Sequence, residues 1–242
     1  RIELPENQRV FLRELRKHAK KLVLVLTGGS ALAVTEEHGY CDAVLQVWYP
    51  GCEGGRAVAD VLFGDVPPGG RLPVTVPRST EDLPPFNDYS MRGRTYRYAD
   101  KDPLYPFGFG LGYTTVAYEE ATVDRRRIAP GETLRVRTRV SNTGARAAYE
   151  TVQCYLVPPA GLPDAPRATL VAFDKIELAP GASREVELVV EAASLLQVDA
   201  DGARAFVPGV YRLVVGSCSP GTRGLELGAP KPVEIDVELV SV

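Results

Sequence analysis

The pattern of apolar residues changes near residue 114, and this change limits the possible folds more than any other feature of the sequence. Before it, apolar residues form short runs at residues 22–26 and 43–48, each followed by a loop that contains glycine. Such runs are typical of strands in a parallel sheet that is covered on both faces. After it, apolar and polar residues alternate, which is typical of strands with one buried face. The sequence therefore predicts an α/β domain followed by an all-β domain.

The first part of the chain alternates predicted helices and strands. Apolar residues between positions 11 and 19 recur at helical spacing, which predicts a helix over residues 5–20. A second helical face follows residue 55 and contains Val58, Val61 and Leu62. A further short strand is predicted at residues 71–76. With the two apolar runs, these segments predict a parallel sheet with helices packed on it.

Between residues 77 and 113 no periodicity is present, and proline, glycine and aromatic residues dominate. A long irregular stretch in a compact protein is usually functional or packed on a surface. Its aromatic residues are too numerous to leave in water, so we expect them to pack the two domains together. They are Tyr96, Tyr98, Tyr105, Phe107, Phe109 and Tyr113.

The second part of the chain predicts an antiparallel β-sandwich. Between residues 134 and 140 the apolar side chains and Thr138 alternate with three arginines, as in a strand with one face in the core. Short turns with proline or glycine separate about seven such segments. The clearest predicted strands are residues 134–140, 151–157, 169–178, 184–190, 209–215 and 233–240.

Composition excludes two classes of partner. The chain has 28 Lys and Arg residues against 31 Asp and Glu residues, a net charge of −3, so a nucleic acid is not an expected partner. The longest apolar run is far shorter than the roughly 20 residues that cross a bilayer, so we expect no membrane span.

Isolated cysteines and histidines carry no recognisable site. The four cysteines are widely spaced, and we expect buried free thiols in preference to disulfides or metal ligands. They are Cys41, Cys52, Cys154 and Cys218. His18 and His38 have no acidic or nucleophilic motif near them, and we expect both on the surface. The sequence thus offers no metal site.

The loop after the second predicted strand is the strongest candidate for a functional site. Open α/β sheets place ligands at the carboxyl ends of their strands, and this loop carries Glu53 between glycines. Trp48 and Tyr49 precede it and offer flat faces on which a sugar ring can stack. The alternative is structural, with Glu53 capping or starting the following helix.

Several ordered motifs resemble the second domain of glycoside hydrolase family 3. The longest is AVLQVWYPGCEGG at residues 43–55, and ADVLFGD at 59–65 and GRLPVT at 70–75 follow it. The agreement continues through DLPPF at 82–86, GRTYRY at 93–98 and YPFGFGLGYTT at 105–115. The alternating strands resemble the family's C-terminal fibronectin type III-like domain. The resemblance covers essentially the whole chain.

This resemblance implies a retaining exo-acting β-glycosidase, a β-xylosidase or β-glucosidase, that needs neither metal nor organic cofactor. Its acid/base maps onto Glu53, although Cys52 replaces the small or polar residue expected before it. Its nucleophile is an Asp on an N-terminal β/α barrel that this chain lacks. The substrate is an oligosaccharide or glycoside. Arg94 and Tyr96 match the family and either line the rim of the active site or pack between domains.

The resulting architecture is a partial α/β sandwich domain at residues 1–92, an aromatic connector at 93–114 and an immunoglobulin/fibronectin type III-like sandwich at 115–242. We expect the chain to be a fragment or processed product, inactive alone. The resemblance favours a periplasmic or secreted protein over a cytoplasmic one. The rival interpretation is a non-catalytic carbohydrate-binding or structural module.

Overall fold

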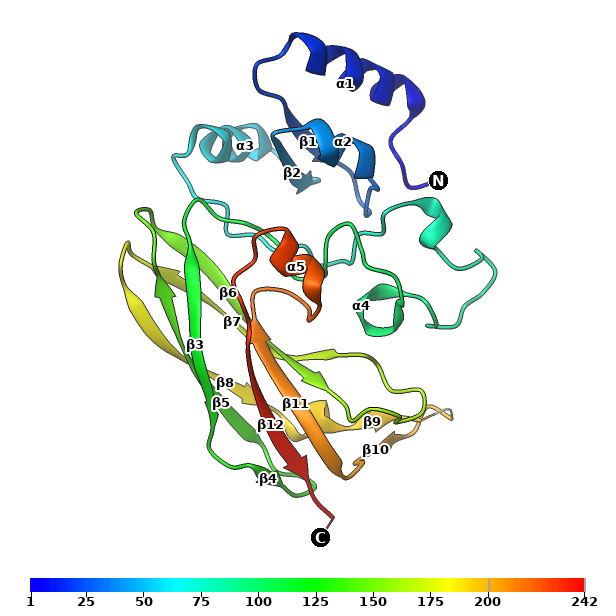
Figure 1. The fold of residues 1–242 in the computed structure, drawn as a ribbon, viewed down its shortest axis with the longest axis vertical. Coiled ribbons are helices and arrows are strands. Elements are labelled where there is room, and N and C mark those ends of the chain that lie inside the picture. The colour runs from blue at the N-terminus through cyan, green and yellow to red at the C-terminus, as the bar shows by residue number, and fades with distance from the viewer. Residues whose placement is uncertain (200, 242) are drawn as a thin grey trace.

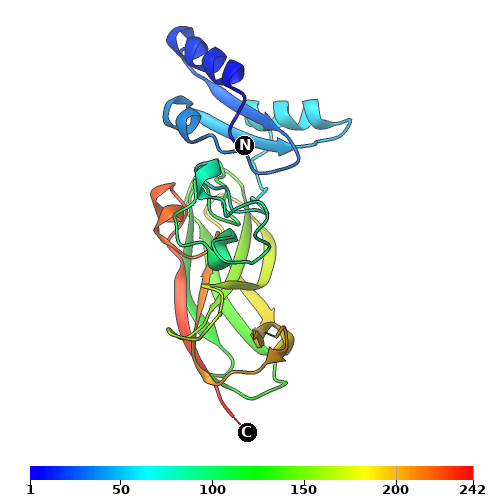
Figure 2. The same ribbon diagram turned by 90° about the vertical axis from the view of Figure 1, so that its right-hand side faces the viewer.

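The computed structural model describes residues 1–199 and 201–241 and has two parts. An α/β layer lies at one end of an elongated β-sandwich, and irregular segments fill the space between them (Figure 1). A quarter turn shows the same stacking, with the C-terminus at the far end of the sandwich (Figure 2). The predicted fold class, α/β followed by an all-β sandwich, is confirmed.

The α/β layer is built on a sheet of two parallel strands. Its elements are α1 (Glu6–His18), β1 (Val23–Thr27), α2 (Thr35–Tyr40), β2 (Ala43–Trp48) and α3 (Gly54–Phe63). Both apolar runs of the sequence are strands, paired in parallel from Val23 opposite Ala43 onward. Since the connection from β1 to β2 passes through α2, both strands end at the same edge of the sheet.

Only one face of β1 is covered, which corrects the expectation of a strand buried on both faces. Leu24 and Leu26 are buried against α1 and the connector. Val23 and Val25 point the other way and stay 41% and 38% exposed. The apolar run correctly indicates a strand that could be covered twice. The element that would cover the second face is not among the described residues of this chain.

The strand predicted at residues 71–76 does not form, because proline interrupts its pairing. Leu72 accepts a hydrogen bond from Gly108 and donates one to Phe109, and Val76 pairs with Tyr105 in an isolated bridge. Pro73 between them has no N–H to donate, so the ladder cannot continue. The segment is an irregular strip that bends at Pro73 and Val74, lies along the connector and is not part of the β1–β2 sheet.

The irregular stretch at residues 77–113 contains two short helical turns, η1 (Thr80–Asp82) before the connector and α4 (Thr95–Tyr98) within it. Phe109 is buried, and Tyr105 stacks on it with ring centroids 6.1 Å apart. Tyr113 is exposed, although its hydroxyl donates to the carbonyl of Val61 at 2.6 Å. The expected packing of the aromatic residues is confirmed for most rings and wrong for that of Tyr113.

The second part is a sandwich of two antiparallel sheets. One sheet has the order β3-β5-β8 and the other β4-β12-β11-β6-β7, in which β4 alone runs parallel to its neighbour. A small hairpin, β9 with β10, lies beside them. The strands are β3 (Val116–Val123), β4 (Arg127–Ile128), β5 (Leu134–Asn142), β6 (Ala148–Val157), β7 (Thr169–Leu178), β8 (Ser183–Val190), β9 (Gln197–Val198), β10 (Arg204–Ala205), β11 (Gly209–Gly216) and β12 (Val233–Leu239). The remaining helical segments are η2 (Ala192–Leu195) and α5 (Thr222–Glu226).

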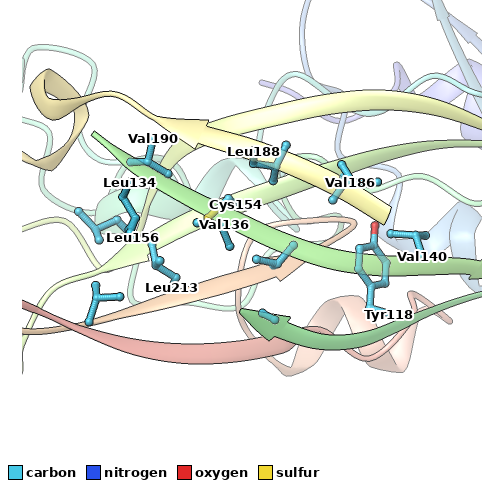
Figure 3. Close-up of a cluster of buried hydrophobic side chains, with 14 of the residues drawn as sticks. Tyr118, Leu134, Val136, Val140, Cys154, Leu156, Val186, Leu188, Val190 and Leu213 are labelled. Carbon is cyan, nitrogen blue, oxygen red and sulfur yellow. The ribbon is translucent and has the colours of Figure 1, made fainter. Parts of the chain in front are cut away.

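The sandwich encloses a continuous apolar core (Figure 3). Along β5 every second side chain from Leu134 to Val140 is buried, as the alternation predicts. The arginines between them point outward, where Arg135 and Arg137 pair with Glu187 on β8. Because both sheets contribute a complete apolar face, this part needs no further element to cover it.

A buried ion pair joins the two parts. Arg71, from the strip below the α/β layer, donates to Glu150 on β6 at 2.6 Å, with the two side chains 8% and 5% exposed. Tyr118 on β3 donates to the other carboxylate oxygen at 2.8 Å. Burial raises the pKa of the Glu150 carboxyl, while Arg71 and the Tyr118 hydroxyl oppose that shift. The contact fixes the strip against the end of the sandwich.

Cysteines and histidines depart in part from the sequence-based expectation. The structure describes all four cysteines as free thiols, but Cys52 is exposed and only Cys154 is fully buried, where burial raises its pKa to about 12. His18 is exposed, whereas His38 is half-buried and its Nδ1 lies 2.9 Å from the hydroxyl of Tyr105. Within residues 1–199 and 201–241, none of the helices combines the length and apolar character needed to cross a membrane.

Candidate functional site

The carboxyl end of β2 is distorted where the candidate loop begins. Leu26 pairs with Gln46 but Thr27 pairs with Trp48, so Val47 is an extra residue that forms a bulge. Trp48 then adopts a left-handed backbone with φ of 53°. Bulges often lie beside active sites and redirect a side chain, and a bulky residue at positive φ is strained. Such strain persists only where the surrounding structure enforces it.

The loop from β2 to α3 is a tight turn that places Glu53 at its end. Gly51 has φ of 71°, a conformation that favours glycine, and its carbonyl accepts a hydrogen bond from Gly54 at 3.2 Å. Glu53 has φ of −88° and ψ of 5°, the values of the third residue of a type I turn. Its carbonyl accepts the first hydrogen bond of α3, from Ala57 at 3.0 Å. The backbone of Glu53 is therefore held on both sides.

The Glu53 side chain has no structural task that the described chain shows. It occupies the N-cap position of α3, yet it makes no capping hydrogen bond to that helix. The carboxylate is exposed at the edge of the sheet where β1 and β2 end. The structural alternative of a helix cap requires that hydrogen bond. The geometry instead leaves the carboxylate available to a ligand.

The loops after the two strands touch each other. Gly28, directly after β1, donates to the carbonyl of Trp48 at 3.3 Å. The ring of Tyr49 lies against Gly29, where an added Cβ would stand 2.8 Å from the ring. Tyr49 is nevertheless 77% exposed, so one face of its ring is free. Tyr49, a predicted sugar-stacking residue four positions before Glu53, thus has one exposed ring face. Because Gly29 has no side chain, the other face can lie close to the loop after β1.

A cavity of about 810 Å³ runs along the outer edge of β2. Every residue of β2 lines it, with α3 and the segments 66–72 and 109–113. Trp48 and Pro50 belong to this lining, whereas Tyr49 and Glu53 lie outside it. Gln46 also lines it, and its buried Nε2 has no hydrogen-bond partner in the described chain. The outer edge of β2 and this amide are therefore both without a partner among the described residues.

His38 lines the same cavity, and sequence reasoning missed it. Its ring packs edge-on against Tyr105 with centroids 5.5 Å apart. Burial lowers the pKa of His38, and the nearby guanidinium groups of Arg223 and Arg78 lower it further. No local motif marks this histidine, because its partners come from segments more than 35 residues away along the chain.

Arg94 and Tyr96 lie in contacts of their own, away from the candidate loop. Arg94 donates from Nε to the carbonyl of Ser90 at 2.9 Å and from Nη2 to the carbonyl of Asp88. It thereby braces the connector loop. Tyr96 stacks on Phe107 with centroids 4.6 Å apart. Its hydroxyl accepts a hydrogen bond from the N–H of Leu170 on β7 at 3.1 Å.

The contact of Tyr96 with β7 reaches the sandwich, as the packing alternative expects, whereas the contacts of Arg94 stay within the loop at residues 88–94. Of the predicted site residues, the structure therefore brings Trp48, Tyr49 and Glu53 together on one loop. Metal-binding groups of three or more His, Cys, Asp or Glu side chains are absent from the residues the structure describes. The loop can offer a carboxylate for proton transfer and an aromatic face for stacking.

Comparison with known families divides the chain in the same two parts. Residues 1–113 match the model described as glycosyl hydrolase family 3 C-terminal domain. Residues 150–219 match the model described as fibronectin type III-like domain.

Curated relatives are glycosidases by name. A xylan 1,4-beta-xylosidase from Xylanibacter ruminicola is 43% identical over 219 residues, which are 90% of this chain and 25% of the relative. A periplasmic beta-glucosidase from Salmonella typhimurium is 34% identical over 233 residues, 89% of this chain and 30% of the relative. The chain thus spans about a quarter to a third of the length of the relatives it matches.

Solved structures agree with the fold over the whole chain. A β-glucosidase from Erythrobacter marinus superposes with a TM-score of 0.82 at 34% identity, over 99% of this chain and 31% of that one. A family 3 β-glucosidase from Bifidobacterium adolescentis gives 0.84 at 30% identity, over 98% and 36%. The identity to these relatives and the order of the two matched domains show that this chain belongs to glycoside hydrolase family 3, with residues of its C-terminal α/β domain followed by a fibronectin type III-like domain.

Proposed function

We propose that the chain is the C-terminal part of a retaining, exo-acting β-glycosidase and supplies the general acid/base, Glu53. The observation that carries this proposal is the exposed Glu53 carboxylate on a constrained loop, which makes no capping hydrogen bond to α3. The glycone is xylose or glucose, since relatives named for both sugars are similar to this chain.

In a retaining mechanism two carboxyl groups lie roughly 5 Å apart. Glu53 first donates its proton to the glycosidic oxygen while the nucleophilic carboxylate attacks the anomeric carbon, so the leaving group departs as an alcohol. Glu53, now a carboxylate, then takes a proton from water, whose oxygen attacks the same carbon and releases the nucleophile. Tyr49 offers its open face to the sugar ring.

The nucleophile is proposed to lie on an N-terminal barrel of the same protein. Exposed apolar surface supports such a partner, since Phe86 and Tyr89, in the loop before the connector, are 94% and 89% exposed. The first residues of the chain lie beside η1, which precedes these two aromatic residues (Figure 1). The N–H of Ile2 donates to the Thr80 hydroxyl at 3.0 Å, and the Glu3 carboxylate accepts from the N–H of Thr80 at 2.7 Å. A covering domain would also remove water from the Glu53 loop.

Replacement of Glu53 by Gln and by Ala in the full-length protein tests the catalytic role. On a substrate with a poor leaving group we expect kcat/KM to fall by about 10²-fold or more, the usual contribution of a general acid. An activated aryl xyloside or glucoside needs little proton donation, so its kcat/KM falls far less. Azide needs no base, so it should restore turnover of Glu53→Ala and give a glycosyl azide.

Asp60→Asn is the matched control, because Asp60 is a carboxylate on α3 that pairs with Arg56 at 3.8 Å. It should leave both substrate classes almost unchanged. Wild-type rates of Glu53→Ala on both classes would place the acid/base elsewhere. The isolated chain should show no turnover of aryl xylosides or glucosides, since it holds one of the two carboxyl groups. Turnover by that chain would refute the division of the site between two domains.

A further inference from the structure

A proline ring packed directly on a glycine closes the loop that carries Glu53. Gly54 is the first residue of α3 and is buried. A Cβ added to Gly54 would stand 2.5 Å from Cγ and 2.7 Å from Cβ of Pro50. Non-bonded carbon atoms prefer separations of about 3.5–4.0 Å, so any side chain at this position has to move the ring by about 1 Å.

The proline ring can yield only in part without its backbone. A change of ring pucker moves Cγ, but Cβ is bonded directly to Cα, so relieving the 2.7 Å contact at Cβ requires a shift of the chain. Pro50 and Gly54 enclose Gly51, Cys52 and Glu53, and the turn between them is closed by the hydrogen bond from Gly54 to Gly51. Displacing the ring therefore displaces the turn that holds the Glu53 backbone.

The neighbouring glycine provides the contrast. A Cβ on Gly55 would meet no atom within 4 Å among the described residues. Gly54 and Gly55 are the first two residues of the same helix, and both have ordinary helical backbone rather than positive φ. An alanine at either position gains the same helix propensity. The two positions differ in the contact with Pro50.

We propose that Gly54 is a positioning residue, which fixes the place of the Glu53 carboxylate through its contact with Pro50. This inference rests on the proposed role of Glu53 as acid/base and adds the element that sets its geometry. A displacement of about 1 Å in a catalytic group can cost about 10²-fold in rate, so the contact matters even though Gly54 has no side chain.

The test compares Gly54→Ala with Gly55→Ala in the full-length protein. The readout is the ratio of kcat/KM on a poor leaving group to kcat/KM on an activated aryl glycoside. Misfolding lowers both values equally and leaves this ratio unchanged, whereas a misplaced proton donor lowers the ratio. We expect Gly54→Ala to lower it by about tenfold or more, as a displaced donor would. Gly55→Ala should keep it within about twofold.

Pro50→Gly is the second variant and covers the case in which Gly54→Ala does not fold. Pro50→Gly removes the ring that packs on Gly54, so the ratio of the two kcat/KM values should fall in this variant too. Adding Gly54→Ala to Pro50→Gly should lower the ratio little further, because the added Cβ no longer meets a proline ring. A full additive loss in the double variant would overturn the inference.

The outcomes separate this inference from the proposed function. If Glu53→Gln lowers the ratio while Gly54→Ala and Pro50→Gly behave like Gly55→Ala, Glu53 is the acid and Gly54 does not position it. If Glu53→Gln itself leaves the ratio unchanged, the acid lies elsewhere and the proposed function fails first.

Discussion

The two parts of this molecule differ in how completely they bury their own apolar residues. In the sandwich, both sheets face a shared core in which Leu134, Cys154 and Leu213 are fully enclosed (Figure 3). In the α/β layer, two strands carry the whole sheet, Val25 faces outward, and Phe63 at the end of α3 is almost fully exposed. The layer therefore depends on further polypeptide, and the sandwich does not.

The candidate functional residue lies on the part that leaves apolar residues uncovered. The candidate acid/base lies on the incomplete layer, at its open edge, and the complete sandwich supplies a rigid base through the Arg71–Glu150 pair. An active site shared between two domains needs one domain to present its loop toward the other. The open face of the layer and the exposed loop that carries Glu53 both support the proposal of a covering domain.

Breaking the buried Arg71–Glu150 pair should change the relative stability of the two parts more than any other substitution proposed below. Glu150→Ala leaves Arg71 charged, buried and unpaired, and loss of one partner of a buried pair costs about 3–5 kcal/mol. We expect the α/β layer to separate from the sandwich and unfold at lower urea concentration. Trp48, the single tryptophan of the chain, reports the layer by fluorescence. Near-UV circular dichroism reports mainly the sandwich, because the buried tyrosines Tyr118, Tyr155 and Tyr211 lie there.

The matched control for this prediction replaces both partners. Arg71→Met with Glu150→Leu removes the charges together, and such replacements are often close to neutral. If the double variant is as unstable as Glu150→Ala, shape and not charge holds the junction. If fluorescence and circular dichroism stay coincident in Glu150→Ala, the two parts unfold as one unit and the contrast between them is wrong.

Truncating one apolar side chain in each part tests whether the two parts differ in burial. Leu213→Ala in the sandwich leaves a cavity in a closed core and should cost about 2–5 kcal/mol in the free energy of unfolding. Val25→Ala on the open face of β1 removes a side chain that water already reaches, so its cost should stay below about 1 kcal/mol. Urea titration of the 242-residue chain measures both. Equal losses would mean that the face of β1 is covered in solution.

The sequence predicts elements well where local pattern and tertiary environment agree. The alternation along β5 is confirmed from Leu134 onward because both its faces are decided within this chain. The apolar run of β1 predicts the strand but not its exposed face. Apolar side chains show that both faces of a strand can be buried, but they do not show which segment packs on each face. At residues 71–76 Pro73 interrupts a pairing that the apolar residues favour.

The candidate site was predictable in its residues and not in its geometry. The glycines and Glu53 stand in a loop at the expected edge of the sheet, so residue types alone mark it. The bulge at Val47 and the positive φ of Trp48 depend on the register between β1 and β2, which no local pattern encodes. The contact of Pro50 with Gly54 likewise requires the shape of the turn.

Acid should produce the smallest effect, and it should act first on the α/β layer. The backbone N–H of Thr80 holds the pKa of Glu3 at about 2, and that of Leu22, with Lys21, holds the pKa of Asp42 at about 2. Both values are depressed below the ordinary range near 4. The stability that these groups contribute is therefore present above about pH 4 and is lost as the pH falls toward 2.

Glu150 at the junction has the opposite sign, because burial raises its pKa and the folded protein binds that proton more readily than the unfolded chain. The stability that this shift contributes is already complete below the ordinary glutamate pKa near 4, so it stays constant while the layer loosens between about pH 4 and 2. We expect Trp48 fluorescence to change between about pH 4 and 2 at lower urea than circular dichroism. Glu3→Gln and Asp42→Asn should each weaken this pH dependence.

Glu187→Gln provides the control for the acid experiment. Arg137 and Arg135 lower the pKa of Glu187, but this carboxylate lies on the outer face of the sandwich. Its loss should alter the circular dichroism transition and leave the Trp48 transition in place. Asp42 and Glu187 are exposed and Glu3 is half-buried, so salt reaches all three and the shifts should shrink at high ionic strength, least for Glu3. A Trp48 transition that ignores Glu3 and Asp42 but follows Glu187 would mean that the sandwich, and not the layer, sets the acid limit of the chain.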